Sequence, residues 1–139
     1  MPVPHDDAGS VSVFALIAAT ILVMFVGVAA DLGGKVHTLQ RAQDVARQAA
    51  RAAAEAAFAP SAIKGDAASV DPGRAVQAGQ AYLSAAGISG TVSVAGDTVT
   101  VQTTTTYTPV ILGLAGIGTQ TVTGESTARL ERALQGVQR

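Results

Sequence analysis

An uninterrupted run of uncharged, mostly apolar residues extends from Val11 to Ala30. As a helix, twenty residues span about 30 Å, the thickness of the hydrocarbon core of a bilayer. Helix-forming residues continue beyond Asp31 into an alanine-rich stretch with a polar face, which Pro60 and Ser61 should end. The pattern therefore predicts one long helix over residues 10–59, capped by Ser10. Its first half, residues 11–30, would cross a membrane, and its second half would lie in water.

Two glycines interrupt this helix near the expected water boundary. Gly33 and Gly34 each cost about 1 kcal/mol relative to alanine in a helix. Because strong helix formers follow at once, we expect a continuous helix with a soft point there, from about Ser10 to Phe58.

Residues 60–139 carry the signals of a small α+β soluble domain. Asp71 followed by Pro72 is a typical N-cap and first helical residue, and Gly87 is a typical C-terminal residue in the left-handed conformation. These residues predict a second helix over residues 72–86, with Val76 and Leu83 on its buried side.

Alternating apolar and polar residues then predict an antiparallel sheet of about three strands. Residues 90–95 and 98–107 form a hairpin around Gly96 and Asp97, and residues 119–130 form the third strand. Five valines should face the helix that packs on the sheet, which we take to be residues 72–86: Val92, Val94, Val99, Val101 and Val122.

The apolar segment 109–118 lies between the second and third strands and is too short to span a membrane. It should either tuck under the sheet or touch the membrane surface. The fold class is thus α+β, a long N-terminal helix followed by a second helix and a small sheet, with a pilin-like shape.

Small residues recur at helical spacing along the long helix, and such spacing lets helices approach closely. Three pairs, four residues apart, belong to the membrane end: Ala15 with Ala19, Ala29 with Gly33, and Ala30 with Gly34. A second stripe in the aqueous half could face a partner or the chain's own β-domain: Ala42, Ala46, Ala49 and Ala53.

Composition limits the function classes. The chain of 139 residues has a formal net charge of −1 and no cysteine. The charge gives no basis for binding nucleic acid, and the absence of cysteine excludes disulfides and thiolate metal sites. Residues 1–9 contain two prolines and two aspartates and should form a disordered tail.

No residue cluster resembles an active site. The two histidines, His5 and His37, lack the partners that a metal site needs, and no nucleophile-elbow or phosphate-loop pattern occurs. We therefore expect no enzyme activity, cofactor or metal. Asp31 is the polar residue of interest, either as a carboxylate in the headgroup layer or as a contact to a partner.

The order of these features resembles the TadE/TadG-like proteins of bacterial Flp (tight-adherence) pilus systems, in the actinobacterial style. The resemblance is carried by residues 9–14 (GSVSVF), 28–34 (VAADLGG) and the alanine-rich residues 43–57. It implies a membrane-anchored structural component, either a minor pseudopilin or a TadG-like assembly factor, that acts by helix packing. The implied partners are the lipid bilayer and other pilus subunits, in homo- or hetero-oligomers.

One position departs from the family pattern. TadE-type pseudopilins are similar to type IV pilins, which are cut after a glycine and carry glutamate at the fifth mature position. Cleavage between Gly9 and Ser10 would place Phe14 there. The missing glutamate favours the uncleaved, TadG-like side of the family.

Two features of the sequence predict opposite orientations of the chain in the membrane. Lys35, Arg41 and Arg47 follow the apolar run, and basic residues favour the cytoplasmic side. The family resemblance implies the opposite, a single-pass protein of the cell membrane with its C-terminal domain extracytoplasmic, and we adopt that orientation.

Two alternatives remain open. Val28-Ala29-Ala30 before Asp31 resembles a signal-peptidase site, so residues 1–30 could be a signal peptide of a small secreted protein. The chain could also be an unrelated single-pass membrane scaffold.

Overall fold

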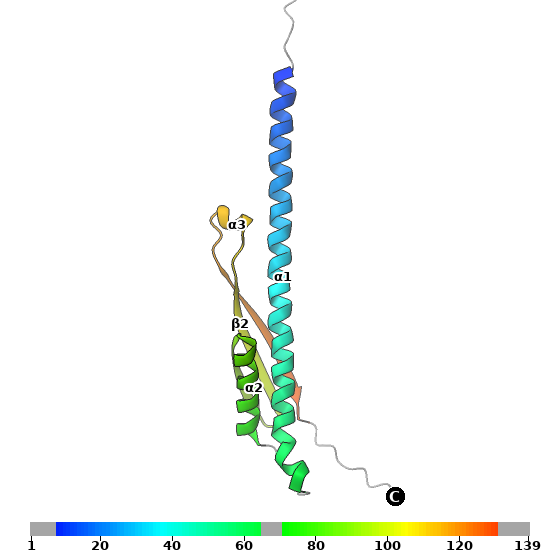
Figure 1. Ribbon diagram of the computed structural model, residues 1–139, viewed down its shortest axis with the longest axis vertical. Helices are drawn as coiled ribbons and strands as arrows, with labels where there is room; N and C mark the ends of the chain where they lie inside the picture. The colour runs from blue at the N-terminus through cyan, green and yellow to red at the C-terminus, as the bar shows by residue number, and fades with distance from the viewer. Residues whose placement is uncertain (1–7, 65–70, 131–139) are drawn as a thin grey trace, which may run out of the picture.

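The computed structural model describes residues 8–64 and 71–130. One helix, α1, runs along the whole molecule, and a second helix and a three-stranded sheet lie against its C-terminal half (Figure 1). The elements are α1 (Ala8–Lys64), α2 (Pro72–Ala86), β1 (Ser89–Ala95), β2 (Thr98–Tyr107), α3 (Ile111–Leu114) and β3 (Gln120–Arg129). The predicted α+β fold, with its long N-terminal helix, second helix and antiparallel sheet, is confirmed.

Helix α1 is continuous over 57 residues and passes through Gly33 and Gly34 without a break. At 1.5 Å per residue its length is about 85 Å. The Thr38 hydroxyl donates to the Gly34 carbonyl at 2.9 Å, within the helix. The predicted continuity is therefore confirmed.

Both predicted ends of α1 are wrong. The helix begins at Ala8, so Ser10 lies within its first turn and is not the N-cap, and it ends at Lys64 beyond Pro60. A proline removes one backbone donor, and a helix can accommodate that loss by bending. Figure 1 shows the last part of α1 bent away from the main axis. The predicted disordered tail, apart from Ala8 and Gly9 in α1, lies outside the described residues.

Helix α2 has the predicted bounds because both of its ends are capped. The Asp71 side chain accepts a hydrogen bond from the Arg74 backbone N–H at 3.1 Å, and Pro72 occupies the first turn. Gly87 adopts φ 65°, and the next backbone N–H, of Ile88, donates to the Leu83 carbonyl at 3.2 Å. Tyr82 also donates to the Gln48 side chain of α1.

The sheet has the order β1-β2-β3 and is antiparallel throughout. Val92 pairs with Val101, and Val94 pairs with Val99, so the predicted hairpin valines share one face. Val99 and Val101 are completely buried. Thr103 lies on the same face and is also completely buried, which the alternation of valines did not predict.

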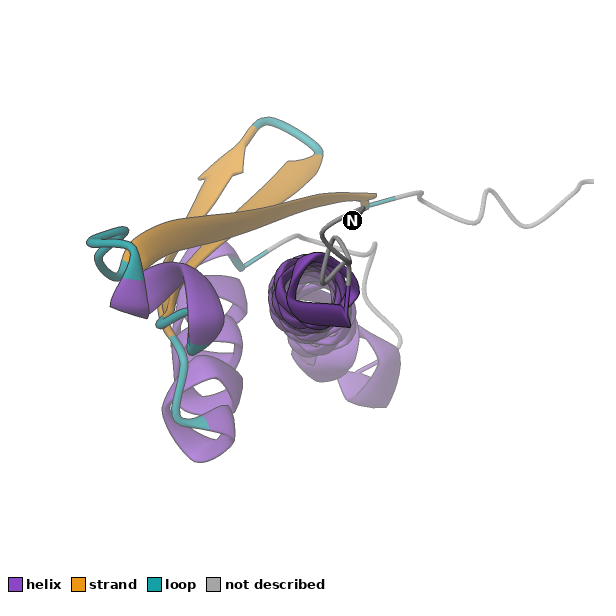
Figure 2. Cartoon of the chain, turned by 90° about the horizontal axis from the view of Figure 1, so that it is seen from above, coloured by secondary structure: helices purple, strands orange, loops and turns teal. Residues whose placement is uncertain are grey.

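Two helices cover this face of the sheet. Helix α1 packs against β2 and β3, whereas α2 packs mainly against β1 and α1 (Figure 2). The prediction that the valines face a packed helix is right, but the assignment to α2 alone is wrong. The alanines of α1 allow that helix to come close to the sheet, so α1 supplies most of the covering surface.

The contact between α1 and the sheet is nearly backbone to backbone. A Cβ placed on Gly124 of β3 would lie 2.6 Å from the Ala42 carbonyl carbon and 2.7 Å from the Gln43 nitrogen. The Thr103 hydroxyl donates to the Ala42 carbonyl at 2.9 Å. The core therefore includes the C-terminal half of α1, so residues 60–139 do not form a core by themselves.

Gly124→Ala should lower the free energy of unfolding by about 1–3 kcal/mol, because the added methyl group forces α1 away from β3. Gly113→Ala is the matched control, since a Cβ at Gly113 meets no atom within 4 Å. Denaturant unfolding of both variants in detergent micelles would test this. Equal stabilities would show that α1 does not depend on this close approach.

Candidate functional site

The junction between α1 and the loop joining β2 to β3 is centred on Asp31. This carboxylate is 4% exposed and accepts four hydrogen bonds, three from the loop and one from Tyr107 at the end of β2. Oδ1 accepts from the Val110 N–H at 2.8 Å and from the Tyr107 hydroxyl at 3.2 Å. Oδ2 accepts from the Ile111 N–H at 2.8 Å and the Leu112 N–H at 2.7 Å.

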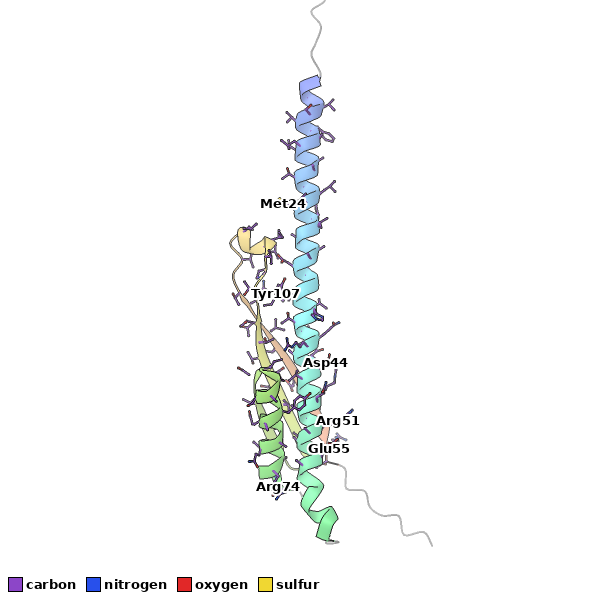
Figure 3. The ribbon with its side chains drawn as sticks, in the orientation of Figure 1. Met24, Asp44, Arg51, Glu55, Arg74 and Tyr107 are labelled. Carbon is purple, nitrogen blue, oxygen red and sulfur yellow. The ribbon has the colours of Figure 1, made fainter. Side chains whose placement is uncertain are left out.

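The loop sequence explains why it needs an acceptor. Buried Pro109 lies two residues after the end of β2 and cannot donate a ladder hydrogen bond, so the strand does not continue through it. The first N–H groups of a helix have no partner within the helix, and Val110 makes no side-chain cap for α3. Asp31 supplies that cap from a different element. Figure 3 shows Tyr107 at the end of β2, beside α1.

The hydrogen bonds also shift two pKa values. The Leu112 N–H, together with the other donors, holds the pKa of Asp31 below its ordinary value of 3.8, although burial opposes this. A carboxylate with a lowered pKa stabilises the fold fully above that ordinary value, and its contribution is lost as the pH falls through the lowered pKa. The contribution of Asp31 to holding the loop should therefore be complete above pH 3.8 and be lost only at a lower pH. Burial, the hydrogen bond and the negative charge of Asp31 raise the pKa of Tyr107 above 10.0.

Two glycines of α1 let the loop approach the helix. A Cβ on Gly27 would lie 2.6 Å from Ile111 Cγ1, and one on Gly34 would lie 2.6 Å from the Tyr107 hydroxyl oxygen. Sequence reasoning missed Gly27. Its spacing of four and seven residues from Asp31 and Gly34 places all three on one helix face, which is the signal that could have identified it.

The small residues predicted for membrane contacts divide into two groups. Gly34 is half-buried under Tyr107, so its small size serves contact within the chain. The other five remain on the exposed surface: Ala15, Ala19, Ala29, Ala30 and Gly33. Their part in association between membrane helices stays a prediction.

The alanine stripe faces the interior of the molecule. The C-terminal half of α1 packs against α2 and the sheet, and all four predicted residues are 0% exposed: Ala42, Ala46, Ala49 and Ala53. The partner-facing interpretation is wrong because the chain's own body covers the stripe. The partner-facing interpretation of Asp31 is wrong for the same reason, since the loop occupies both carboxylate oxygens.

The N-terminal part of α1 extends beyond the rest of the body. Its side chains point into open space, with Phe14 72% and Leu22 66% exposed. Among the described residues, Gly9–Ala57 is the one helical stretch long and apolar enough to cross a membrane. The Thr20 hydroxyl donates to the Leu16 carbonyl at 2.9 Å, so it brings no unsatisfied donor into this segment. Gly9 and Ser10 lie in the exposed first turn.

No group of three or more metal-ligating side chains occurs in residues 8–64 and 71–130. The structure therefore has three functional parts. The N-terminal half of α1 is apolar and exposed, and the folded body consists of α2 and the sheet packed on the C-terminal half of α1. The polar clamp, Asp31 with its hydrogen-bond donors in the loop, lies where the two halves of α1 meet.

Comparison with known proteins agrees with the resemblance seen in the sequence. Residues 9–57 match the family described as "Putative Flp pilus-assembly TadE/G-like". The matched residues include both the apolar part of α1 and the part packed in the core. No curated protein and no solved structure is significantly similar to the chain.

Asp31→Asn should release the loop, because an amide has one acceptor oxygen where the carboxylate has two. Amide hydrogen exchange at Val110, Ile111 and Leu112 should become markedly faster, while exchange in β2 changes little. Asp44→Asn is the matched control, since Asp44 is an exposed carboxylate on the same helix. Unchanged protection of the loop in Asp31→Asn would contradict the assigned role.

Ala53→Leu should lower the free energy of unfolding by about 1–3 kcal/mol through overpacking. Ala53 is 0% exposed and lies against the site of Gly79 in α2. Ala29→Leu, at an exposed alanine of the same helix, is the control and should leave stability unchanged. If Ala53→Leu were as stable as the unmodified chain, the packing of α1 against α2 would be in error.

Proposed function

We propose that this protein is a membrane-anchored structural component of a Flp/Tad-type pilus assembly, closer to the TadG-like factors than to cleaved pseudopilins. It crosses the membrane once through residues 11–30, and its α+β body lies outside the cytoplasm. It acts by packing against other pilus subunits. The family match over residues 9–57 supports this assignment.

One observation carries the proposal: a single helix provides both the apolar segment and the centre of the folded body. The large apolar side chains of this segment, such as Phe14, Leu22 and Phe25, are exposed and are not covered by the folded body. Because α1 is unbroken, a force or displacement in the membrane segment is transmitted directly to the body. Such a rigid link suits a subunit held in an assembly.

The proposed contact with other subunits lies in the membrane segment. Ala15 and Ala19 form an exposed small-residue surface that another helix could approach closely. The four stripe alanines of the aqueous half, Ala42, Ala46, Ala49 and Ala53, are unavailable because the body buries them. This leaves the membrane half of α1 as the helix surface on which packing with partners depends.

The double variant Ala15→Leu/Ala19→Leu, expressed in the source bacterium lacking the natural gene, tests this function. We expect pili to be lost or strongly reduced, with the membrane level of the protein unchanged, because leucines separate the packed helices. Val13→Leu adds bulk on the opposite helix face and should preserve piliation. Normal piliation in the gene deletion itself would reject a role in pilus assembly.

The mass and orientation of the membrane-bound protein separate the proposal from its alternatives. The proposal predicts a chain that keeps its membrane segment uncleaved, whereas a pseudopilin would begin at Ser10 and a secreted protein at Asp31. Because the chain lacks cysteine, Thr91→Cys on the exposed sheet face provides a single labelling site. An impermeant thiol reagent should label it in intact cells freed of any outer barrier, and protection there would reverse the proposed orientation.

A further inference from the structure

The apolar loop between β2 and β3 has exposed side chains that the body does not cover. Val110 is 72% exposed, Leu114 is 86% exposed and Ile117 is 41% exposed. The loop lies at the end of the sheet nearest the apolar part of α1, far from the lower end of α2 (Figure 1). Its contact with Gly27 sets its level along the helix.

We propose that this loop, residues 109–118, inserts into the lipid leaflet nearest the folded body, beside the end of the membrane segment of α1, and so forms a second membrane contact of the body. The inference rests on the proposed membrane anchoring by residues 11–30. Gly27, which contacts Ile111 of the loop, lies three residues before Ala30, so this contact is about 4.5 Å inside the end of the apolar segment. The occupant of the exposed loop surface is therefore the lipid bilayer.

Backbone N–H groups of the loop have hydrogen-bond acceptors within the protein and do not depend on water. Unsatisfied backbone groups are costly in lipid, so an inserted loop must satisfy its own donors. Asp31 accepts from the N–H groups of residues 110, 111 and 112. The N–H groups of residues 115 and 117 donate to the Leu112 carbonyl, and that of residue 116 donates to the Gly113 carbonyl. Six backbone N–H groups of the loop therefore have an acceptor within the protein.

The side chains around the loop are also compatible with insertion. No charged residue occurs between Asp97 and Glu125, so the loop, all of β2 and the first five residues of β3 bring no charged side chain to the membrane. The hydroxyls of Thr108 and Thr119 lie 3.0 Å apart and form one hydrogen bond between the two ends of the loop. Lys35, one turn beyond Asp31 on α1, is exposed and available to lipid phosphates at the surface.

Three single-cysteine proteins test the insertion, because the natural chain has no cysteine. Leu114→Cys reports on the loop, Val26→Cys on the exposed side of α1 at a similar level, and Thr91→Cys on the outer face of the sheet. Each full-length protein is labelled with an environment-sensitive fluorophore and diluted into phosphatidylcholine vesicles. Vesicles with and without doxyl-labelled lipid are then compared.

We expect the label at Leu114 to match that at Val26, with blue-shifted emission and strong quenching by doxyl lipid, while the label at Thr91 stays water-exposed. If Leu114 behaves like Thr91 while Val26 is quenched, the loop inference is wrong and the anchor stands. Blue-shifted but unquenched emission at Leu114 would place the loop against protein and also overturn the inference. A water-exposed label at Val26 would reject the anchor and the inserted loop together.

Discussion

The close approach of α1 to the sheet is the contact on which the rest of the structure depends. Alanine presents only a methyl group, so the helix backbone reaches the sheet at Gly124, where no side chain intervenes. Dispersion forces act only at contact distance, and a core of this size has few large side chains with which to compensate for a gap. The Thr103 hydroxyl, buried in the same contact, finds its acceptor in the Ala42 carbonyl because the two backbones are so near. The placement of α2 beside α1 follows the same principle at Gly79 and Ala53.

A second contact, polar rather than apolar, fixes the other end of the sheet to the same helix. Asp31 binds backbone groups that lie 79 to 81 residues later in the chain. A carboxylate near a bilayer is costly unless its oxygens are well satisfied, and here the four donors provide that. The polar clamp holds the loop against α1. Gly27 and Gly34 have no side chain and so leave space for Ile111 and Tyr107. The apolar tip is therefore held beside the exposed helix.

The two contacts attach the sheet to α1 at two levels, at Ala42 and at Asp31, so the folded body and the exposed half of α1 are joined through one continuous helix. The residues similar to the pilus-assembly family, 9–57, cover the segment of α1 that extends beyond the body and the segment within it. The body has its apolar loop at the end where the exposed half of α1 begins, and helix α2 lies toward the other end (Figure 1). The apolar surfaces therefore lie at one end of the body, as expected for a protein whose long helix crosses a membrane at that end.

The helices and strands could be predicted from short stretches of sequence, whereas the contacts between them are decided by the folded chain. The apolar run from Val11 to Ala30, the cap residues Asp71 and Gly87 and the alternating valines act over a few residues, so the long helix, α2 and the hairpin could be read from the sequence. Even there, Pro60 was misjudged, since a bent helix can accommodate a proline. The position of Asp31 next to the apolar run marks it as a residue of interest in the sequence. Its hydrogen-bond donors, however, lie about 80 residues later, and only the folded chain brings them to it. The alanine stripe was equally suited to a partner or to the chain's own sheet, because a small-residue surface permits close contact without specifying with what. Only the return of β2 and β3 over Ala42 and Ala49 decided that it belongs to the core.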